Sequence, residues 1–549
     1  MQQLRVASGT VVDVVQRRIF GARIEVSPSG RIEAVRPEPS PGSGFIVPGF
    51  VDAHVHVESS MLTPTAFASE AVRHGTVAAV IDPHEIANVL GMAGVDFMLD
   101  EAGRCPLLFA TGAPSCVPAT PFETAGATLA ADRIALLLDR AEITHLSEMM
   151  NVPGVLAGDA DILAKIKAAR QRGKPVDGHA PGLRGPDLVR YLRAGISTDH
   201  ESLDLDEAME KAAAGMFVQL RRGSAARGFE SFLPVLQRYP GACMFCSDDK
   251  HPDDLLQGHI NDSVRIAVAA GIDLFDVLRA ASLNPVRHYG LGMGLLQPGE
   301  RADWVEVEDL RGFRVRRTVV GGRILAENGV SLLEPLSPLS LPNHFRLQPV
   351  AAAVFRIPAR AGACRVIGVR DGALVTEAWT CMPTVRDRAV VADPQRDLVK
   401  LAVFNRYSAA APPALALASG LGLERGAMAA SVAHDCHHVI AAGTDDLLMT
   451  AAVNAVIAHG GGLAAVDGMG AVRTMPLPVA GLMAVGSCSQ AAAAYGRVTE
   501  TVRGCGCRLR APFMTLSFLA LPVIPALKLT DQGLFDGQRF QPVDFWCDC

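Results

Sequence analysis

Short apolar runs alternate with longer amphipathic segments between residues 48 and 300. The short runs fit buried strands, and the longer segments have the periodicity of helices. Strands that alternate with helices form parallel sheets, so the pattern predicts βα units around one sheet. The predicted strands are 50–57, 77–82, 107–111, 143–148, 175–179, 196–200, 216–221 and 243–248. Eight βα units over about 250 residues have the size of a TIM-like (β/α)8 barrel.

Two flanking segments, residues 1–47 and 301–333, instead alternate apolar and polar residues between Gly and Pro. This pattern is typical of short strands, and Gly321-Gly322 indicates a hairpin turn. The two segments are expected to form one small β-sandwich domain, with the barrel domain of residues 48–300 inserted between its halves.

A proline-rich stretch at residues 334–342 predicts a stiff connector to a third domain. Residues 346–549 combine apolar strands, such as 400–404, with Ala- and Gly-rich helices, such as 445–459, which predicts a C-terminal α+β domain. The apolar residues 511–527 contain three prolines and are too short for a membrane span of ~20 residues, so we expect buried strands and turns there. The fold class is therefore α/β.

Composition limits the classes of function. A chain of 549 residues exceeds the roughly 250 to 300 residues that one core supports, so several domains are expected. The net charge of −6 and the lack of a Lys/Arg stripe argue against a nucleic-acid partner. The N-terminus lacks the apolar core of a secretory signal, so we expect a cytoplasmic protein without a membrane role. The twelve cysteines lie scattered and are interpreted as reduced, incidental thiols.

Histidines and carboxylates lie at the C-terminal ends of the predicted strands, where such barrels carry their active sites. His54 and His56 lie one residue apart on the first strand, so both imidazoles face the same side. One such pair is weak evidence, because most histidines are surface or core residues. A larger set of imidazoles and carboxylates at one barrel mouth would repel one another or lack hydrogen-bond partners without cations. We therefore expect a binuclear metal centre. The predicted ligands are His54, His56, Glu148, His179, His200 and Asp248.

The segment from Pro48 to His56 resembles the opening motif of the amidohydrolase superfamily. Further motifs, in the same order along the chain, resemble bacterial adenine deaminases. They are His56-Val-Glu-Ser-Ser60, Asp82-Pro-His-Glu-Ile-Ala-Asn88, Ser115-Cys-Val-Pro-Ala-Thr120, Glu148-Met-Met-Asn151, Asp177-Gly-His-Ala-Pro-Gly182, Thr198-Asp-His-Glu201, Ser247-Asp-Asp249, Asn405-Arg-Tyr407, Ser431-Val-Ala-His-Asp435 and Leu521-Pro-Val-Ile-Pro-Ala-Leu-Lys-Leu529. This ordered set spans nearly the full length and is far more specific than the histidine pair.

The resemblance implies hydrolytic deamination of adenine to hypoxanthine and ammonia, in purine salvage or catabolism. It also implies two divalent ions that activate a bridging hydroxide for attack on purine C6. Mn²⁺ or Fe²⁺ is favoured, and the ligands also suit Zn²⁺. Asp248 would carry the proton to the departing amine, and His200 would stabilise the tetrahedral centre. A homo-oligomer, dimeric or larger, is expected.

Ring nitrogen N1 must gain a proton, and Glu58, His84 and Glu85 are the candidate donors. Asp82 precedes a proline, so an N-cap role is as well supported as a catalytic one. Met149 and Met150 could wall the purine site, although core packing is the commoner role of methionine. Arg221 could contact substrate or lie at a solvated loop junction. The predicted substrate-binding residues are Glu58, Asp82, His84, Ser115, Met149 and Arg221.

Alternative functions stay open because fold and metal site do not fix the substrate. One is an amidohydrolase reaction on another aminopurine or a cyclic amide. The other is a metal-free structural homologue without activity. The C-terminal cluster of His434, Asp435, His437 and His438 is interpreted as a structural network or a lid, and His438 stands where the family motif has Asn.

Overall fold

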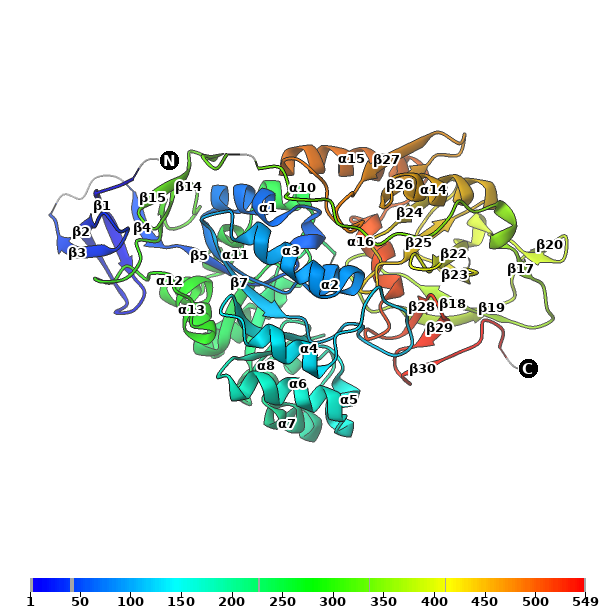
Figure 1. Ribbon diagram of the computed structural model, residues 1–549, viewed down its shortest axis with the longest axis horizontal. Coiled ribbons are helices and arrows are strands. Elements are labelled where there is room, and N and C mark those ends of the chain that lie inside the picture. The colour runs from blue at the N-terminus through cyan, green and yellow to red at the C-terminus, as the bar shows by residue number, and fades with distance from the viewer. Residues whose placement is uncertain (1–2, 40–43, 226–227, 335, 410, 548–549) are drawn as a thin grey trace.

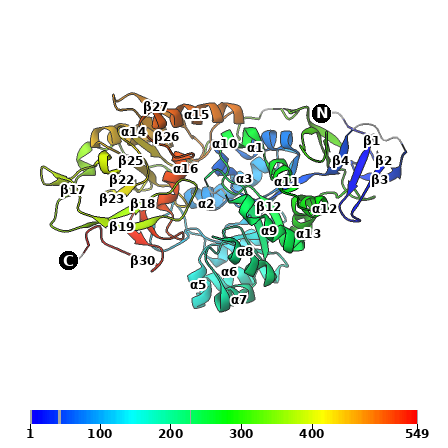
Figure 2. The same cartoon turned by 180° about the vertical axis from the view of Figure 1, so that it is seen from behind.

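The computed structural model describes residues 3–39, 44–225, 228–334, 336–409 and 411–547. Three parts follow one another along the longest axis of the molecule (Figure 1). A β-sheet that contains the first strands lies at one end, the barrel lies in the middle, and the C-terminal region lies at the other end. The view from behind shows the same order (Figure 2).

The central part is a closed barrel of parallel strands. Its strands are β5 (Phe50–Val55), β6 (Thr76–Ile81), β7 (Leu108–Ala113), β8 (Ile143–Met149), β9 (Val176–Gly178), β10 (Thr198–Asp199), β11 (Phe217–Arg221) and β12 (Cys243–Cys246). A parallel bridge between Val55 and Asp248 joins the last strand to the first. A hydrogen bond from Ser197 N to Val176 O, 2.9 Å long, joins β9 to β10. The predicted TIM-like barrel is confirmed.

Amphipathic helices surround the barrel. For example, α9 buries Phe229, Leu233, Val235 and Leu236 on one face. The helices of this part are α1 (Pro64–Ala71), α2 (His84–Leu90), α3 (Met92–Ala102), α4 (Ala131–Leu138), α5 (Val152–Ala157), α6 (Ala160–Gln171), α7 (Gly185–Ala194), α8 (Leu205–Ala213), α9 (Phe229–Arg238), α10 (Pro252–Gln257), α11 (Ile260–Ala269), α12 (Leu274–Leu278) and α13 (Asn284–Tyr289). Their apolar faces cover the strands, so polar chemistry is left to the strand ends and loops.

Strands from both sides of the barrel sequence form one continuous eight-stranded sheet in the order β16-β15-β14-β13-β4-β1-β2-β3. The strands are β1 (Val6–Asp13), β2 (Arg18–Val26), β3 (Ile32–Pro37), β4 (Phe45–Pro48), β13 (Trp304–Val307), β14 (Val315–Val320), β15 (Arg323–Glu327) and β16 (Val330–Ser331). The antiparallel pair β4 and β13 links the two halves, and Trp304 is fully buried there. The exact boundaries of the three domains remain predictions.

The C-terminal region is built on a second eight-stranded sheet in the order β19-β18-β23-β22-β25-β24-β26-β27. Its strands are β18 (Cys364–Gly368), β19 (Glu377–Cys381), β22 (Val399–Phe404), β23 (Ala414–Ser419), β24 (Ala427–Ala430), β25 (Val439–Gly443), β26 (Gly462–Val466) and β27 (Val472–Pro476). Shorter strands are β17 (Ile357–Pro358), β20 (Val385–Arg386), β21 (Ala389–Val390), β28 (Leu527–Thr530), β29 (Gly533–Asp536) and β30 (Gln541–Pro542).

The two faces of this sheet have different partners because successive side chains of a strand point to opposite faces. Ala402 and Phe404 belong to one apolar cluster with helix α14 (Asp446–Ala458). Leu401 and Val403 belong to another cluster, which contains helix α15 (Cys488–Gly504) and residues of the barrel. The second face therefore attaches the C-terminal region to the barrel.

The apolar residues 511–527 do not form the expected strands over most of their length. Pro512 starts helix α16 (Pro512–Ser517), and a 3-10 turn follows at Phe518–Ala520. Proline is tolerated in the first turn of a helix, where its missing N–H has no partner to lose, so its presence did not exclude a helix. Only β28 begins within the stretch. Within the described residues, no helix combines the length and apolar character needed to cross a membrane.

Candidate active site

The histidine pair of the first barrel strand faces the end of the last strand. His54 Nε2 and His56 Nε2 lie 3.1 Å apart. Asp248 Oδ1 lies 3.6 Å from the first of these nitrogens and 3.4 Å from the second. The bridge between Val55 and Asp248 closes the barrel at this point, so barrel closure itself brings the three side chains together.

Glu148, at the end of β8, lies between the remaining predicted ligands. Its Oε2 is 3.0 Å from His179 Nδ1 and 3.1 Å from His200 Nε2. Its Oε1 is 3.4 Å from His56 Nε2. One carboxylate thus reaches histidines from both sides of the barrel mouth. The structure brings all six predicted ligands together, and all are buried.

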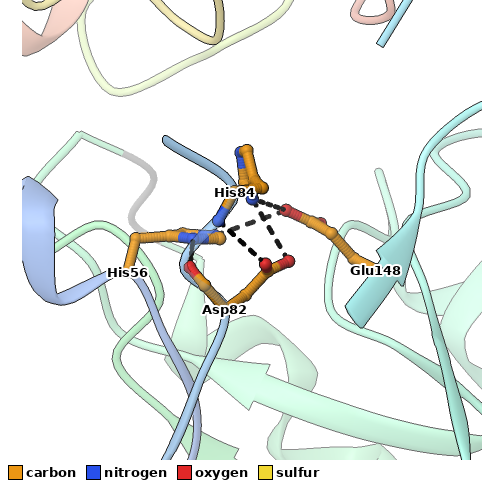
Figure 3. Close-up of side chains that lie close together, drawn as sticks. All are labelled: His56, Asp82, His84 and Glu148. Atoms are coloured by element: carbon orange, nitrogen blue, oxygen red, sulfur yellow. Dashed lines mark hydrogen bonds and ion pairs between the residues drawn. The ribbon is translucent and has the colours of Figure 1, made fainter. Parts of the chain in front are cut away.

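Two further residues complete this cluster (Figure 3). His84 Nδ1 lies 3.1 Å from Asp82 Oδ2 and 3.5 Å from Glu148 Oε1. Asp82 Oδ1 accepts a hydrogen bond of 3.1 Å from the backbone N–H of His84, which starts α2. Asp82 therefore supports the helix start with one oxygen and faces the donor cluster with the other. Sequence reasoning weighed these two roles as alternatives.

The cluster has the donor chemistry of a site for divalent ions. Sets of buried donor atoms lie within 4.8 Å of one another, including the set of His54, His56 and Asp248. Imidazole and carboxylate donors suit first-row transition metals. The ring nitrogens and carboxylate oxygens that face one another in this cluster lie 3.0 to 3.6 Å apart. So many buried imidazoles and carboxylates at such short distances fit a site that holds cations.

The charges of the neighbours keep the two central carboxylates ionised. Burial alone would raise the pKa of Glu148, but His200 and His179 outweigh it and hold the pKa well below its usual range. Burial alone would likewise raise the pKa of Asp248, but Arg221, His200, His54 and His56 together outweigh it and hold the pKa well below its usual range. Both groups are thus available as anionic ligands or bases.

Arg221 lies at the end of β11 and joins two carboxylates. Its Nη1 lies 2.5 Å from Asp248 Oδ2, and its Nη2 donates to Glu201 Oε1 over 2.7 Å. The pKa of this guanidinium is raised, because the two carboxylates outweigh the effect of burial. Sequence reasoning named Arg221 as a substrate contact or a solvated residue and gave Glu201 no role of its own.

The three candidate proton donors have different surroundings. Glu85 accepts a hydrogen bond of 2.9 Å from Ser59 Oγ and lies 3.1 Å from His434 Nδ1. Burial would raise the pKa of Glu85, but His434 outweighs it and lowers the pKa. Burial and the nearby Glu85 charge raise the pKa of Glu58 to about 8. His84 Nε2 lies 3.5 Å from Asp435 Oδ1.

A small cavity opens onto this cluster, and the C-terminal region supplies part of its wall. His84, Glu85 and Arg221 line it together with five of the six predicted metal ligands, all except His54. Met150 lines it too, as the sequence suggested. The wall residues that sequence reasoning did not assign to the site are Glu201, Asp249, Leu374, His434, Asp435, Phe518, Leu521 and Ile524. The sequence signal for the C-terminal ones was their place in or beside the motifs 431–435 and 521–529, and Leu374 lies near neither motif.

Four of the predicted substrate-binding residues lie behind this wall. Glu58, Asp82, Ser115 and Met149 are buried but do not belong to the described lining of the cavity. Ser115 Oγ donates to Glu148 O over 2.5 Å, and Met149 belongs to an apolar core cluster. Its neighbour Met150 faces the cavity. A direct substrate contact of these four residues remains a prediction.

Comparisons with known proteins agree over the whole chain. The amidohydrolase family matches residues 45–325, and the adenine deaminase C-terminal domain matches residues 373–541. A Salinibacter ruber protein named adenine deaminase is 50% identical over 543 residues, which cover 98% of this chain and 99% of the relative. Proteins of the same name from a Sulfurovum species and from Methanosarcina acetivorans are 48% and 44% identical, over 97% and 98% of this chain and 98% and 99% of theirs.

Proposed function

The chain belongs to the adenine deaminase family of amidohydrolases, and we propose on this premise that it hydrolyses adenine to hypoxanthine and ammonia. The observation that carries the proposal is identity of 50% over nearly the full length of both chains. The similarity includes the C-terminal region, which lines the cavity and matches a domain named for this family. The amidohydrolase barrel by itself would leave the substrate class open.

We propose that His54, His56, Glu148, His179, His200 and Asp248 hold two divalent ions, with Mn²⁺ or Fe²⁺ favoured over Zn²⁺. The close approach of their buried donor atoms supports this assignment. When bound, such ions would supply the Lewis acidity that lowers the pKa of a water molecule. Asp82 and His84 lie in the same donor cluster and would support the ligands His56 and Glu148 beside them.

Asp248 is proposed as the residue that moves the proton. Its ionised carboxylate would accept a proton from the attacking water and deliver it to the amino group that leaves C6. Arg221 holds Asp248 Oδ2, which leaves Oδ1 directed at the two histidines. His200 would stabilise the tetrahedral centre that develops at C6.

We assign the protonation of N1 to Glu85, which lines the cavity, with Glu58 as the source of the proton. Despite burial, His434 lowers the pKa of Glu85 and keeps it ionised, whereas burial and the Glu85 charge raise the pKa of Glu58 to about 8, so Glu58 holds the proton that Glu85 would pass to N1. Ser59 and His434 fix the Glu85 carboxylate at the cavity wall. The Glu58 carboxylate bonds to the backbone N–H of Ile86 over 3.3 Å and lies outside the described lining. Glu58 would therefore act through its neighbour Glu85.

The proposal is tested with purified protein reconstituted with Mn²⁺ or Fe²⁺. Loss of adenine absorbance should accompany release of one ammonia for each adenine consumed. Turnover of a cyclic amide or another aminopurine, without turnover of adenine, would overturn the substrate assignment. A metal analysis without stoichiometric metal would instead favour the structural homologue. A homo-oligomer and a cytoplasmic location remain predictions.

A further inference from the structure

A lysine is buried directly behind the part of the cavity wall that the C-terminal region supplies. Lys528 lies on β28, and its side chain is fully buried. Its Nζ donates to the backbone carbonyls of Leu374, over 2.8 Å, and Phe518, over 2.9 Å. Within the described residues, no carboxylate forms an ion pair with this amine. Lysine is almost never fully buried without such a partner, so the two carbonyl contacts call for an explanation.

Both carbonyls belong to residues that line the cavity. Leu374 and Phe518 are far apart in the sequence, and Lys528 is the group that bonds to both. A threonine fastens the first segment further, because Thr376 N donates to Pro525 O over 3.0 Å and Thr376 Oγ1 donates to Leu527 O over 2.8 Å. Two separate wall segments are thus fixed to the start of one strand.

The second wall segment, at Phe518, is connected through His434 to Glu85, the proposed N1 proton donor. The Phe518 ring stacks on His434, with ring centroids 4.4 Å apart and planes 19° apart. His434 Nδ1 lies 3.1 Å from Glu85 Oε1. A continuous series of contacts therefore runs from Lys528 through Phe518 and His434 to the carboxylate that faces the substrate cavity.

We propose that Lys528 is a positioning residue for substrate binding, which holds Leu374 and Phe518 as the apolar wall of the purine site. Aromatic and aliphatic walls of this kind bind a flat heteroaromatic ring by stacking and burial. A wall that shifts by a fraction of an ångström loses contact with the ring, while the donor cluster on the barrel strands stays in place. The inference rests on the proposed function, because it takes adenine as the ligand.

The test compares Lys528→Met with Lys400→Met. Lys400 is also a buried lysine of the C-terminal region; its Nζ donates to Phe355 O over 3.0 Å and pairs with Asp446 over 2.7 Å, outside the described cavity lining. Lys528→Met should raise KM for adenine about tenfold, because two hydrogen bonds that hold the wall are lost, and should leave kcat within about threefold. Lys400→Met should leave KM unchanged. Metal stoichiometry should stay at the wild-type value in both variants.

A second variant keeps the test decisive if Lys528→Met fails to fold. Thr376→Val preserves the shape of the side chain and removes its bonds to Leu527 O and Ala526 N. We expect KM to rise about threefold, the equivalent of one weak hydrogen bond. An unchanged KM in folded Lys528→Met, or in Thr376→Val when Lys528→Met is unfolded, would overturn the inference. Equal kinetic losses in Lys528→Met and Lys400→Met would also overturn it. Wild-type turnover of adenine is the separate readout of the proposed function.

Discussion

The barrel mouth and the C-terminal wall contribute opposite kinds of surface to the same cavity. The barrel supplies imidazoles, carboxylates and Arg221 from its strand ends. The C-terminal region supplies mainly apolar and aromatic groups, namely Leu374, Phe518, Leu521 and Ile524, with His434 and Asp435 at the boundary. This difference indicates that the barrel provides the reacting groups and that the C-terminal region provides the apolar wall that shapes the cavity. Variants of the barrel should therefore change kcat, and variants of the C-terminal wall should change KM.

The largest expected effect comes from the proton carrier of the barrel. Asp248→Asn keeps one oxygen donor but removes the base, so kcat should fall by about 10²- to 10⁴-fold. Some metal should stay bound, as measured by atomic emission. A kcat near the wild-type value would show that Asp248 does not carry the proton. It would also argue against the assignment of the chemical step to the barrel.

A smaller effect should follow from loosening the barrel side without touching a ligand. The Tyr191 hydroxyl donates to Met149 O over 2.6 Å and accepts from His179 N over 3.4 Å, so it joins the backbones beside two predicted ligands. Tyr191→Phe should weaken metal affinity about tenfold, as loss of supporting groups does. Metal titration of the apoprotein measures this. Tyr495→Phe, at a buried tyrosine of the C-terminal region, is the matched control and should bind metal normally.

The boundary between the two regions is tested at His434. His434→Gln removes the stacking on Phe518 and the ion pair with Glu85. KM for adenine should rise about three- to tenfold, because stacked aromatic pairs contribute roughly 0.5–1.5 kcal/mol. Steady-state kinetics at saturating metal provide the measurement. A fall in kcat alone would show that His434 acts in the chemical step and does not position the cavity wall.

A separate test concerns the contact between the two regions and depends on pH. Burial, together with the charge of Asp435, raises the pKa of Glu123 to about 8. The folded protein then binds a proton that the unfolded chain releases near pH 4.5, so stability is lost as pH rises from about 5 through 8. Glu123→Gln mimics the protonated form and can still accept the bond from Thr120 Oγ1.

This variant should match the wild type at pH 5 and be more stable at pH 8.5, by on the order of 1–3 kcal/mol. Urea unfolding at both pH values measures the difference. The same stability difference at both pH values would show that Glu123 is already ionised in the folded protein at pH 5.

The barrel and the convergence of the six proposed ligands could be predicted from sequence because they follow local rules. A two-residue period places His54 and His56 on one side of a strand, and parallel strands bring their C-terminal ends to one edge. These rules act within single elements, so no knowledge of distant contacts was needed. The resemblance of the motifs to a known family then supplied the substrate class.

The C-terminal wall could not be predicted because it depends on docking between regions. Phe518 lies in an apolar stretch that we expected to form strands, and nothing in its neighbourhood indicates that its ring meets His434. The position of Leu374 likewise depends on Lys528, more than 150 residues away in the sequence. Docking of one face on another is decided by shape and burial over many residues, which a single sequence does not show.

The seam where Val55 meets Asp248 has a consequence for the order in which the protein is made. During synthesis the first histidine pair leaves the ribosome long before Asp248, so the complete donor set cannot form until the last barrel strand has emerged. The cavity wall is completed later still, because Phe518 and Lys528 come much later in the sequence than Asp248. A nascent chain could therefore capture metal before it could enclose a purine, and premature termination would leave a metal-binding barrel without a substrate pocket.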